Sequence, residues 1–132
     1  MAVAVDQAGH IWLYNRGSHP IIEFSKEGKV LEAWKENPKV TLHAASAHGL
    51  GVGPDGGLWL VDREANTVWK FSQQGRAEVV IGTFAGRAGN NRSPYAFNRP
   101  TGVAFDSQGN VYVSDGYKNA RVAKYTPAGK FL

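Results

Sequence analysis

The chain alternates short apolar runs with glycine-centred polar turns, and this arrangement occurs three times. The three copies run from Val3 to Gly28, from Leu50 to Gly75 and from Val103 to Gly129. Each has an apolar triplet, a turn, a run ending in Asn or Asp, and a second run ending in an aromatic residue. Short β-rich runs bounded by Gly, Asp and Asn are typical of strands joined by tight turns. The sequence therefore predicts an all-β chain built from three copies of one unit.

The spacing of the copies predicts their architecture. The turn glycines Gly9, Gly56 and Gly109 lie 47 and 53 residues apart, and repeat periods of about 40–50 residues indicate propeller blades or another stacked array. We expect four-stranded antiparallel blades at about 1–36, 46–82 and 99–132, with a long loop at about 83–98. A propeller ring has about 4–8 blades. The chain is therefore expected to be an incomplete propeller, half of a six-bladed ring, completed by a longer chain or by a second copy.

Within each copy the apolar runs give the expected strands. They are 3–5, 11–14, 21–24 and 30–34 in the first copy, 50–52, 58–61, 67–71 and 77–81 in the second, and 103–105, 111–114 and 122–125 in the third. The fourth strand of the third copy falls beyond the end of the sequence. Aromatic residues recur at matched positions, and we expect them to pack between blades: Trp12, Trp59 and Tyr112, then Phe24, Phe71 and Tyr125.

Composition and charge exclude several classes of protein. The 132 residues carry a net charge of +4 and no cysteine, so disulfides, thiolate nucleophiles and cysteine metal sites are excluded and the compartment stays open. No apolar run has the length of a membrane span and no signal-peptide pattern begins the chain. Residues 79–105 contain no acid, but include Arg87, Arg92 and Arg99. We favour a solvated loop there over an anion-binding one, and the slight charge argues against nucleic acid as a partner.

Three segments carry a more specific resemblance. They are LYNRGSHP (Leu13 to Pro20), AHGLGVGPDGGLWLVD (Ala47 to Asp62) and FNRPTGVAFDSQGNVYVSDGYKNARVAKYTPAGKFL (Phe97 to Leu132). The copies resemble NHL repeats, and these segments resemble the propeller of the peptidyl-α-hydroxyglycine α-amidating lyases. The resemblance implies a six-bladed propeller that holds zinc on three histidines and a structural calcium. It also implies a lyase that cleaves an N–C bond of a small-molecule or peptide substrate, giving an amide and glyoxylate.

The resemblance implies a role for five residues of this chain. Arg16 matches the arginine that faces the substrate, His48 the first zinc histidine, and Tyr117 the tyrosine that acts as base. Val3 and Leu50 match the positions whose backbone carbonyls reach the calcium. The family's other two zinc histidines and its calcium-binding aspartate belong to later blades. Because a catalytic zinc takes three protein ligands, the site is incomplete in these residues, and we expect the isolated chain to be inactive.

Each of these residues also has a purely structural interpretation. A lone histidine such as His48 is often a packing residue, and Arg16 has a counterpart, Arg63, at the same position of the second copy. The turn that carries Tyr117 is one residue longer than its two counterparts, which favours a special role. Asp62 and Asp115 match Asn15 and are expected to close turns. The other histidines, His10, His19 and His43, are expected on the surface or in turns.

Two other functional classes remain open. One is a non-catalytic NHL scaffold that binds protein or RNA, supported by Tyr95 and Phe97 among the loop arginines, because basic and aromatic residues together bind single strands. The other is a structural half-ring that forms a homodimer through its two open sides.

The family's animal members have a disulfide at positions that are Asn98 and Lys118 here. Its absence is consistent with a bacterial-type member. The localisation is not fixed by the sequence, and an exported bacterial parent is one option.

Overall fold

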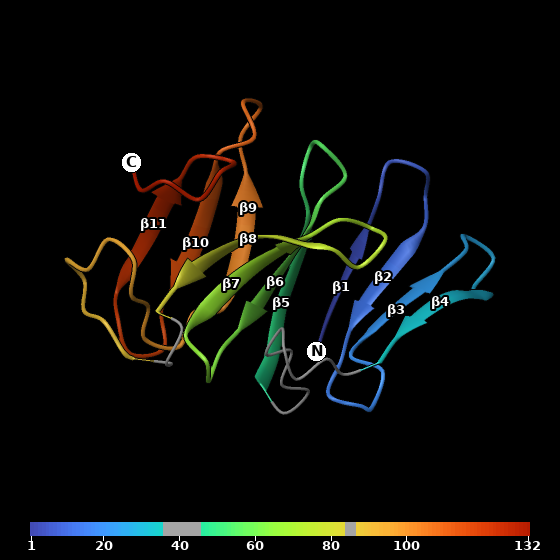
Figure 1. The fold of residues 1–132 in the computed structure, drawn as a ribbon, viewed down its shortest axis with the longest axis horizontal. Helices are drawn as coiled ribbons and strands as arrows, with labels where there is room; N and C mark the ends of the chain where they lie inside the picture. The colour runs from blue at the N-terminus through green and yellow to red at the C-terminus, as the bar shows by residue number, and fades with distance from the viewer. Residues whose placement is uncertain (36–45, 84–86) are drawn as a thin grey trace.

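The computed structural model describes residues 1–35, 46–83 and 87–132, which form eleven strands (Figure 1). The strands make three antiparallel sheets that stand side by side as an open arc. Within these ranges, no helix has the length and apolar composition needed to span a membrane. The prediction of incomplete all-β propeller blades is confirmed.

Each sheet is a meander in which strands adjacent in sequence pair with one another. The first consists of β1 (Ala2–Val5), β2 (Ile11–Tyr14), β3 (Ile21–Phe24) and β4 (Val30–Trp34). The second consists of β5 (Ala47–Val52), β6 (Leu58–Asp62), β7 (Thr67–Phe71) and β8 (Ala77–Gly82). The third consists of β9 (Gly102–Phe105), β10 (Val111–Asp115) and β11 (Arg121–Tyr125), and Phe131 adds one antiparallel bridge to Tyr125.

Glycines with a left-handed backbone close the hairpin turns, as predicted. In the first turn, Gly9 has a φ of 84° and its N–H donates to the carbonyl of Asp6 at 3.1 Å. The Asp6 carboxylate accepts the backbone N–H groups of Ala8 and His10, both at 2.9 Å. The turn is therefore held by backbone and side chain together, because glycine adopts a positive φ without steric cost.

Two apolar cores fill the spaces between neighbouring sheets. Residues of the first and second sheets form one core: Trp12, Tyr14, Ile21, Ala47, Leu58, Leu60, Trp69 and Phe71. Residues of the second and third sheets, together with Phe97, form the other: Trp59, Val61, Val68, Ile81, Val111, Val113, Ala123 and Tyr125. Burying a large apolar side chain contributes about 1.5–3 kcal/mol. The expected packing of aromatic residues between blades is confirmed for Trp12, Trp59, Phe71 and Tyr125. Phe24 and Tyr112 are half-buried and belong to neither core.

The first strand of the second blade differs from the sequence-based expectation. β5 begins at Ala47, three residues before the predicted start at Leu50. Ala47 pairs with Asp62 and Gly49 pairs with Val61, so His48 is an extra residue in the ladder, a β-bulge. Apolar alternation does not reveal such an insertion, because the bulge interrupts the two-residue period.

Candidate functional site

The turns that carry the predicted site residues lie along one edge of the sheets, the lower edge in Figure 1. Arg16 follows β2, Arg63 follows β6 and Tyr117 follows β10, while His48 lies at the start of β5. These elements belong to three different blades. The fold therefore gathers residues that are distant in the sequence at one end of the arc.

His48 is aimed by its bulge and held by a backbone carbonyl. Its Nδ1 lies 2.8 Å from the carbonyl oxygen of Thr101. Because a carbonyl only accepts hydrogen bonds, Nδ1 must carry the proton, and the lone pair resides on Nε2. Bulges commonly re-aim side chains next to active sites. The neutral form of the His48 ring thus presents an unprotonated nitrogen to the site, as a metal ligand requires.

Tyr117 lies beside that nitrogen. Its hydroxyl is 3.4 Å from His48 Nε2, and the two rings meet edge to face with centroids 5.5 Å apart. The side chain of Tyr117 is 54% exposed, so its hydroxyl remains accessible. The structure therefore brings together two of the residues to which the resemblance gave roles, although 69 positions separate them in the sequence.

Arg63 is a third member of the site that sequence reasoning did not assign to it. Its guanidinium carbon lies 5.5 Å from the centroid of the Tyr117 ring, which is within the range of a cation–π contact. The available signal was its equivalence to Arg16 in the preceding copy. That equivalence indicates only that arginine recurs at this position of the repeat, since a single sequence does not show which aromatic ring the arginine contacts.

Arg16 reaches the same edge from the first blade. It is exposed, and its Nε donates to the carbonyl of Ala47 at 3.3 Å, one residue before His48. Within the described ranges, no contact joins Arg16 directly to the side chain of His48 or Tyr117. The turn that carries Arg16 is fixed by Asn15, whose side chain accepts from Gly17 and donates to the carbonyl of His19.

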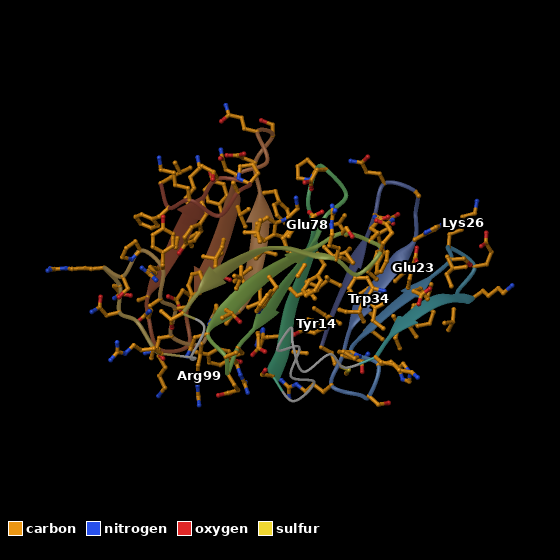
Figure 2. All side chains as sticks on the ribbon, viewed as in Figure 1. Tyr14, Glu23, Lys26, Trp34, Glu78 and Arg99 are labelled. Atoms are coloured by element: carbon orange, nitrogen blue, oxygen red, sulfur yellow. The ribbon has the colours of Figure 1, made fainter. Side chains whose placement is uncertain are left out.

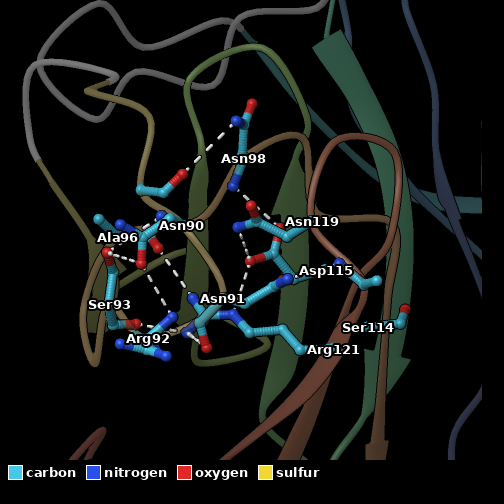
Figure 3. A network of polar contacts seen from close by, with 12 residues as sticks. Asn90, Asn91, Arg92, Ser93, Ala96, Asn98, Ser114, Asp115, Asn119 and Arg121 are labelled. Atoms are coloured by element: carbon cyan, nitrogen blue, oxygen red, sulfur yellow. Dashed lines mark hydrogen bonds and ion pairs between the residues drawn. The ribbon is translucent and has the colours of Figure 1, made fainter.

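Buried aspartates position the turns that carry Arg63 and Tyr117. Asp62 accepts from Ser46 and from the backbone N–H of Ala65. Asp115 accepts from Asn119, from Arg121 and from a backbone N–H (Figure 3). Both carboxylates are fully buried. The prediction that Asp62 and Asp115 close turns is confirmed.

The Tyr14 hydroxyl is not an alternative base at this edge. Burial raises the pKa of Tyr14 well above its ordinary value of 10.0, and the negative charge of Asp62 raises that pKa further. Tyr14 is also fully buried in the core between the first two sheets (Figure 2). Its phenol therefore stays neutral and out of contact with solvent.

The described residues do not assemble the predicted zinc site. A catalytic zinc takes three protein ligands, and His48 is the single predicted zinc ligand in the described part of the chain. Among the described residues, the one group of three with metal-ligand geometry is Asp6, His10 and Glu23. It lies at the opposite end of the blade, where His10 pairs with Glu23 at 2.6 Å and Asp6 closes a turn. His43 lies outside the described residues.

The positions predicted to reach calcium lie on the inner strands, which are the first strands of the three sheets and contact one another. Val3 is on β1 and Leu50 on β5, and each of these strands pairs with a neighbour on one side only. Some backbone carbonyls of β1 and β5 therefore point away from the paired strand. That arrangement is compatible with carbonyl ligands for calcium, and the role of Val3 and Leu50 stays a prediction.

The long loop uses its aromatic residues for packing. Phe97 is fully buried in the core between the second and third sheets. The Tyr95 ring lies against Tyr125 and Phe131, with centroids 6.3 Å and 6.4 Å away. Phe97 is therefore unavailable to stack on a nucleic-acid base.

Comparison with known proteins agrees with this architecture. The family model described as the NHL repeat matches residues 97–125, which include β9, β10 and β11. Residues 97–125 therefore carry an NHL repeat. The chain is 34% identical over 108 residues to peptidyl-alpha-hydroxyglycine alpha-amidating lyase 1 of Drosophila melanogaster. That match covers 80% of this chain and 18% of the relative.

Two further similarities extend over most of the chain. The mouse NHL repeat-containing protein 3 is 28% identical over 124 residues, which cover 86% of this chain and 34% of that protein. A solved structure of streptogramin B lyase superposes with a TM-score of 0.71 at 19% identity, covering 100% of this chain and 39% of that one. At this identity the structural match shows the fold alone. The chain spans about a fifth to a third of the length of the relatives named here.

Proposed function

We propose that this edge of the NHL blades is part of the active site of a carbon–nitrogen lyase similar to the amidating lyases. The observation that carries the proposal is the pairing of His48 Nε2 with the Tyr117 hydroxyl at 3.4 Å. A lone packing histidine would not need a bulge, a carbonyl that fixes its tautomer and an accessible phenol beside it. The similarity to the Drosophila lyase supports the same conclusion.

The proposed reaction breaks the N–C bond of an α-hydroxyglycine. Tyr117, as its phenolate, takes the proton of the substrate hydroxyl, the electron pair of the O–H bond forms the carbonyl of glyoxylate, and the N–C bond breaks. The departing nitrogen takes up the proton that Tyr117 received and becomes the amide, which leaves Tyr117 as the phenolate again. Arg16 orients the substrate by binding the substrate's carboxylate, because a guanidinium binds a carboxylate with two parallel hydrogen bonds.

Zinc enters this proposal only through His48. A bound zinc would supply Lewis-acid stabilisation of the alkoxide, and His48 Nε2 is suited to be one of its ligands. The described residues provide one ligand of the three, so they do not fit a complete site. We expect the chain alone to bind Zn²⁺ weakly, as a single-histidine site does.

Binding and turnover are tested separately. N-acetyl-α-hydroxyglycine is titrated into the ¹⁵N-labelled chain, and glyoxylate release is measured in the same samples with and without Zn²⁺. We expect saturable shifts of the His48 and Tyr117 resonances, which Tyr117→Phe weakens and His48→Ala abolishes. We expect little or no glyoxylate, because the zinc ligands are incomplete.

His19→Gln is the matched control, since His19 lies in a turn of the first blade and outside the His48–Tyr117 pair. It should leave the shifts unchanged. A folded chain that shows no saturable response at His48 or Tyr117 would contradict the proposal. Equal losses in His19→Gln and His48→Ala would show that the response is not specific to the site.

The alternative is a non-catalytic NHL scaffold that binds protein or RNA. Its similarity-based support is the match to mouse NHL repeat-containing protein 3. Burial of Phe97 removes one of the two aromatic residues that support the RNA-binding alternative. RNA binding with a steep salt dependence would favour this alternative.

A further inference from the structure

Two arginines from separate elements hold one carboxylate, and one of the two, Arg63, also lies against the Tyr117 ring. Arg63, in the turn after β6, places Nη2 2.7 Å from Glu64 Oε1. Arg99, just before β9, places Nη2 3.2 Å from Glu64 Oε2. The Glu64 carboxylate therefore has one oxygen on each guanidinium. The side chains of Glu64 and Arg99 are 42% and 45% exposed, so solvent reaches this group at the lower edge of the molecule (Figure 2).

Arg63 retains binding capacity that Glu64 does not use. Its Nε is buried and has no hydrogen-bond partner within the described residues. A guanidinium offers five N–H donors in a fixed plane, and a buried donor without an acceptor is costly. The Tyr117 ring lies 5.5 Å from the Arg63 guanidinium carbon. Glu64 therefore uses Nη2 of this guanidinium and leaves Nε unsatisfied.

The backbone holds Arg99 in place for this contact. Asn66 and Arg99 are the two described non-glycine residues with positive φ, at 56° and 62°. They are joined by a hydrogen bond of 2.6 Å from the Arg99 N–H to the Asn66 side chain. Non-glycine residues adopt this conformation at a cost in free energy. The hydrogen bond to Asn66 therefore fixes the backbone from which the Arg99 side chain extends.

We propose that Arg63 and Arg99 form a carboxylate-binding site, which Glu64 occupies as an internal ligand until a carboxylate-bearing molecule displaces it. The seated Glu64 side chain shows that a planar carboxylate fits between the two guanidinium groups. Two arginines against one glutamate leave the site with a net positive charge. The site borders the His48–Tyr117 pair through the Tyr117 ring, but binding at it does not depend on lyase chemistry.

Displacement of Glu64 is feasible because ion pairs at this exposure are weak. Pairs of this kind stabilise a protein by about 1 kcal/mol or less, which corresponds to about a fivefold change in an equilibrium constant. Removing the internal competitor should therefore tighten the binding of an external carboxylate by about fivefold. Removing either arginine should weaken that binding.

Acetate titrated into the ¹⁵N-labelled full chain, with chloride at equal ionic strength as reference, tests the proposal. We expect a saturable shift of the Arg63 Nε–Hε resonance with acetate and none with chloride. Glu64→Gln should saturate at about fivefold lower acetate. Arg63→Gln and Arg99→Gln, followed through the Tyr117 ring resonances, should need at least about tenfold more.

Arg92→Gln is the control, because it removes the same charge from an exposed loop residue without touching Glu64. Its titration should match that of the unaltered chain. A shift that never saturates, that chloride reproduces, or that Arg92→Gln weakens as much as Arg63→Gln would overturn the proposal. Amide spectra of the variants separate loss of binding from loss of fold. Since acetate lacks the hydroxyl group of the lyase substrate, failure here leaves the proposed reaction untouched.

Discussion

Position 49 shows how closely the inner strands approach one another. A Cβ added to Gly49 would lie 2.6 Å from the carbonyl oxygen of Thr101 and 2.9 Å from the Cα of Gly102. Thr101 is the residue whose carbonyl fixes the His48 ring. The glycine therefore allows β5 and β9 to meet at the distance that the site needs.

We predict that Gly49→Ala destabilises the chain by about 1–3 kcal/mol, the usual cost of overpacking, and weakens the His48–Thr101 hydrogen bond. Urea denaturation measures the first effect, and the His48 nitrogen chemical shifts report the second. Gly116→Ala is the matched control, because a Cβ there meets nothing within 4 Å. Equal stabilities of the two variants would contradict the role given to Gly49.

A second prediction concerns the turn between β9 and β10. The Asn110 side chain, backbone N–H groups and Tyr112 lower the pKa of Asp106 from its ordinary value of 3.8 to about 2. A carboxylate with a lowered folded-state pKa stabilises the fold above its unfolded pKa, and this contribution is lost as the pH falls. Stability should therefore decrease from about pH 4 toward pH 2.

We expect Asn110→Ala to raise the pKa of Asp106, and Asp106→Asn to remove this part of the pH dependence. Carboxyl ¹³C titration measures the pKa, and denaturation at several pH values measures the stability. An unchanged Asp106 titration in Asn110→Ala would show that the amide is not the principal cause.

At the scale of elements, one arginine connects the third blade to the long loop. Arg121 pairs with the buried Asp115 at 2.9 Å and donates to the carbonyls of Ser93 at 2.5 Å and Ala96 at 2.8 Å (Figure 3). The same loop is also held by the burial of Phe97 and by a hydrogen bond from the Tyr125 hydroxyl to the carbonyl of Pro94. Arg121 adds a contact that connects the loop to a buried carboxylate.

We predict that Arg121→Gln destabilises the chain by about 3–5 kcal/mol, because it leaves a buried carboxylate without its cation. Hydrogen exchange should accelerate in residues 87–98, while β5 to β7 change less. Arg92→Gln, in the same loop but exposed, should have little effect. If both variants lower the free energy of unfolding equally, the contacts of Arg121 would not be the reason that the loop is ordered.

The sequence predicted the elements well because strands and turns depend on local patterns. Apolar runs and Gly-centred turns gave strands such as Thr67–Phe71 at the residues observed. For the candidate site, the resemblance named Arg16, His48 and Tyr117, and the structure brings His48 and Tyr117 into contact. Arg63 was missed and the bulge at His48 was not seen, because both depend on contacts between blades. No local pattern encodes which ring an arginine will cover.

The whole molecule is an open arc whose first sheet has an uncovered face. Val3 and Val5 are 61% and 60% exposed, whereas Leu50 and Val52, at the same positions of the second sheet, pack against the core between the first two sheets. The third sheet ends in an uncovered face that includes Val122, 66% exposed. Apolar faces of this kind promote association.

We predict that the isolated chain self-associates in a concentration-dependent manner. A discrete dimer by light scattering would support closure of six blades by two copies. Val5→Lys and Val122→Lys should each shift the equilibrium toward monomer. Val5→Lys puts a charge on the open face of the first sheet, and Val122→Lys puts one on the open face of the third. A monomer at all concentrations would contradict this expectation. It would favour the alternative that further blades of a longer chain cover the two open faces.

The bulge at His48 makes the candidate site separable from the scaffold that carries it. A single extra residue re-aims one side chain, while the hairpins on both sides keep the pattern of the other blades. Deleting that residue would restore an uninterrupted ladder from Ala47 to Val52 without disturbing the cores. A repeat array of this design can therefore gain or lose a reactive group by one insertion or deletion, and overall resemblance between two such arrays is weak evidence that both are enzymes.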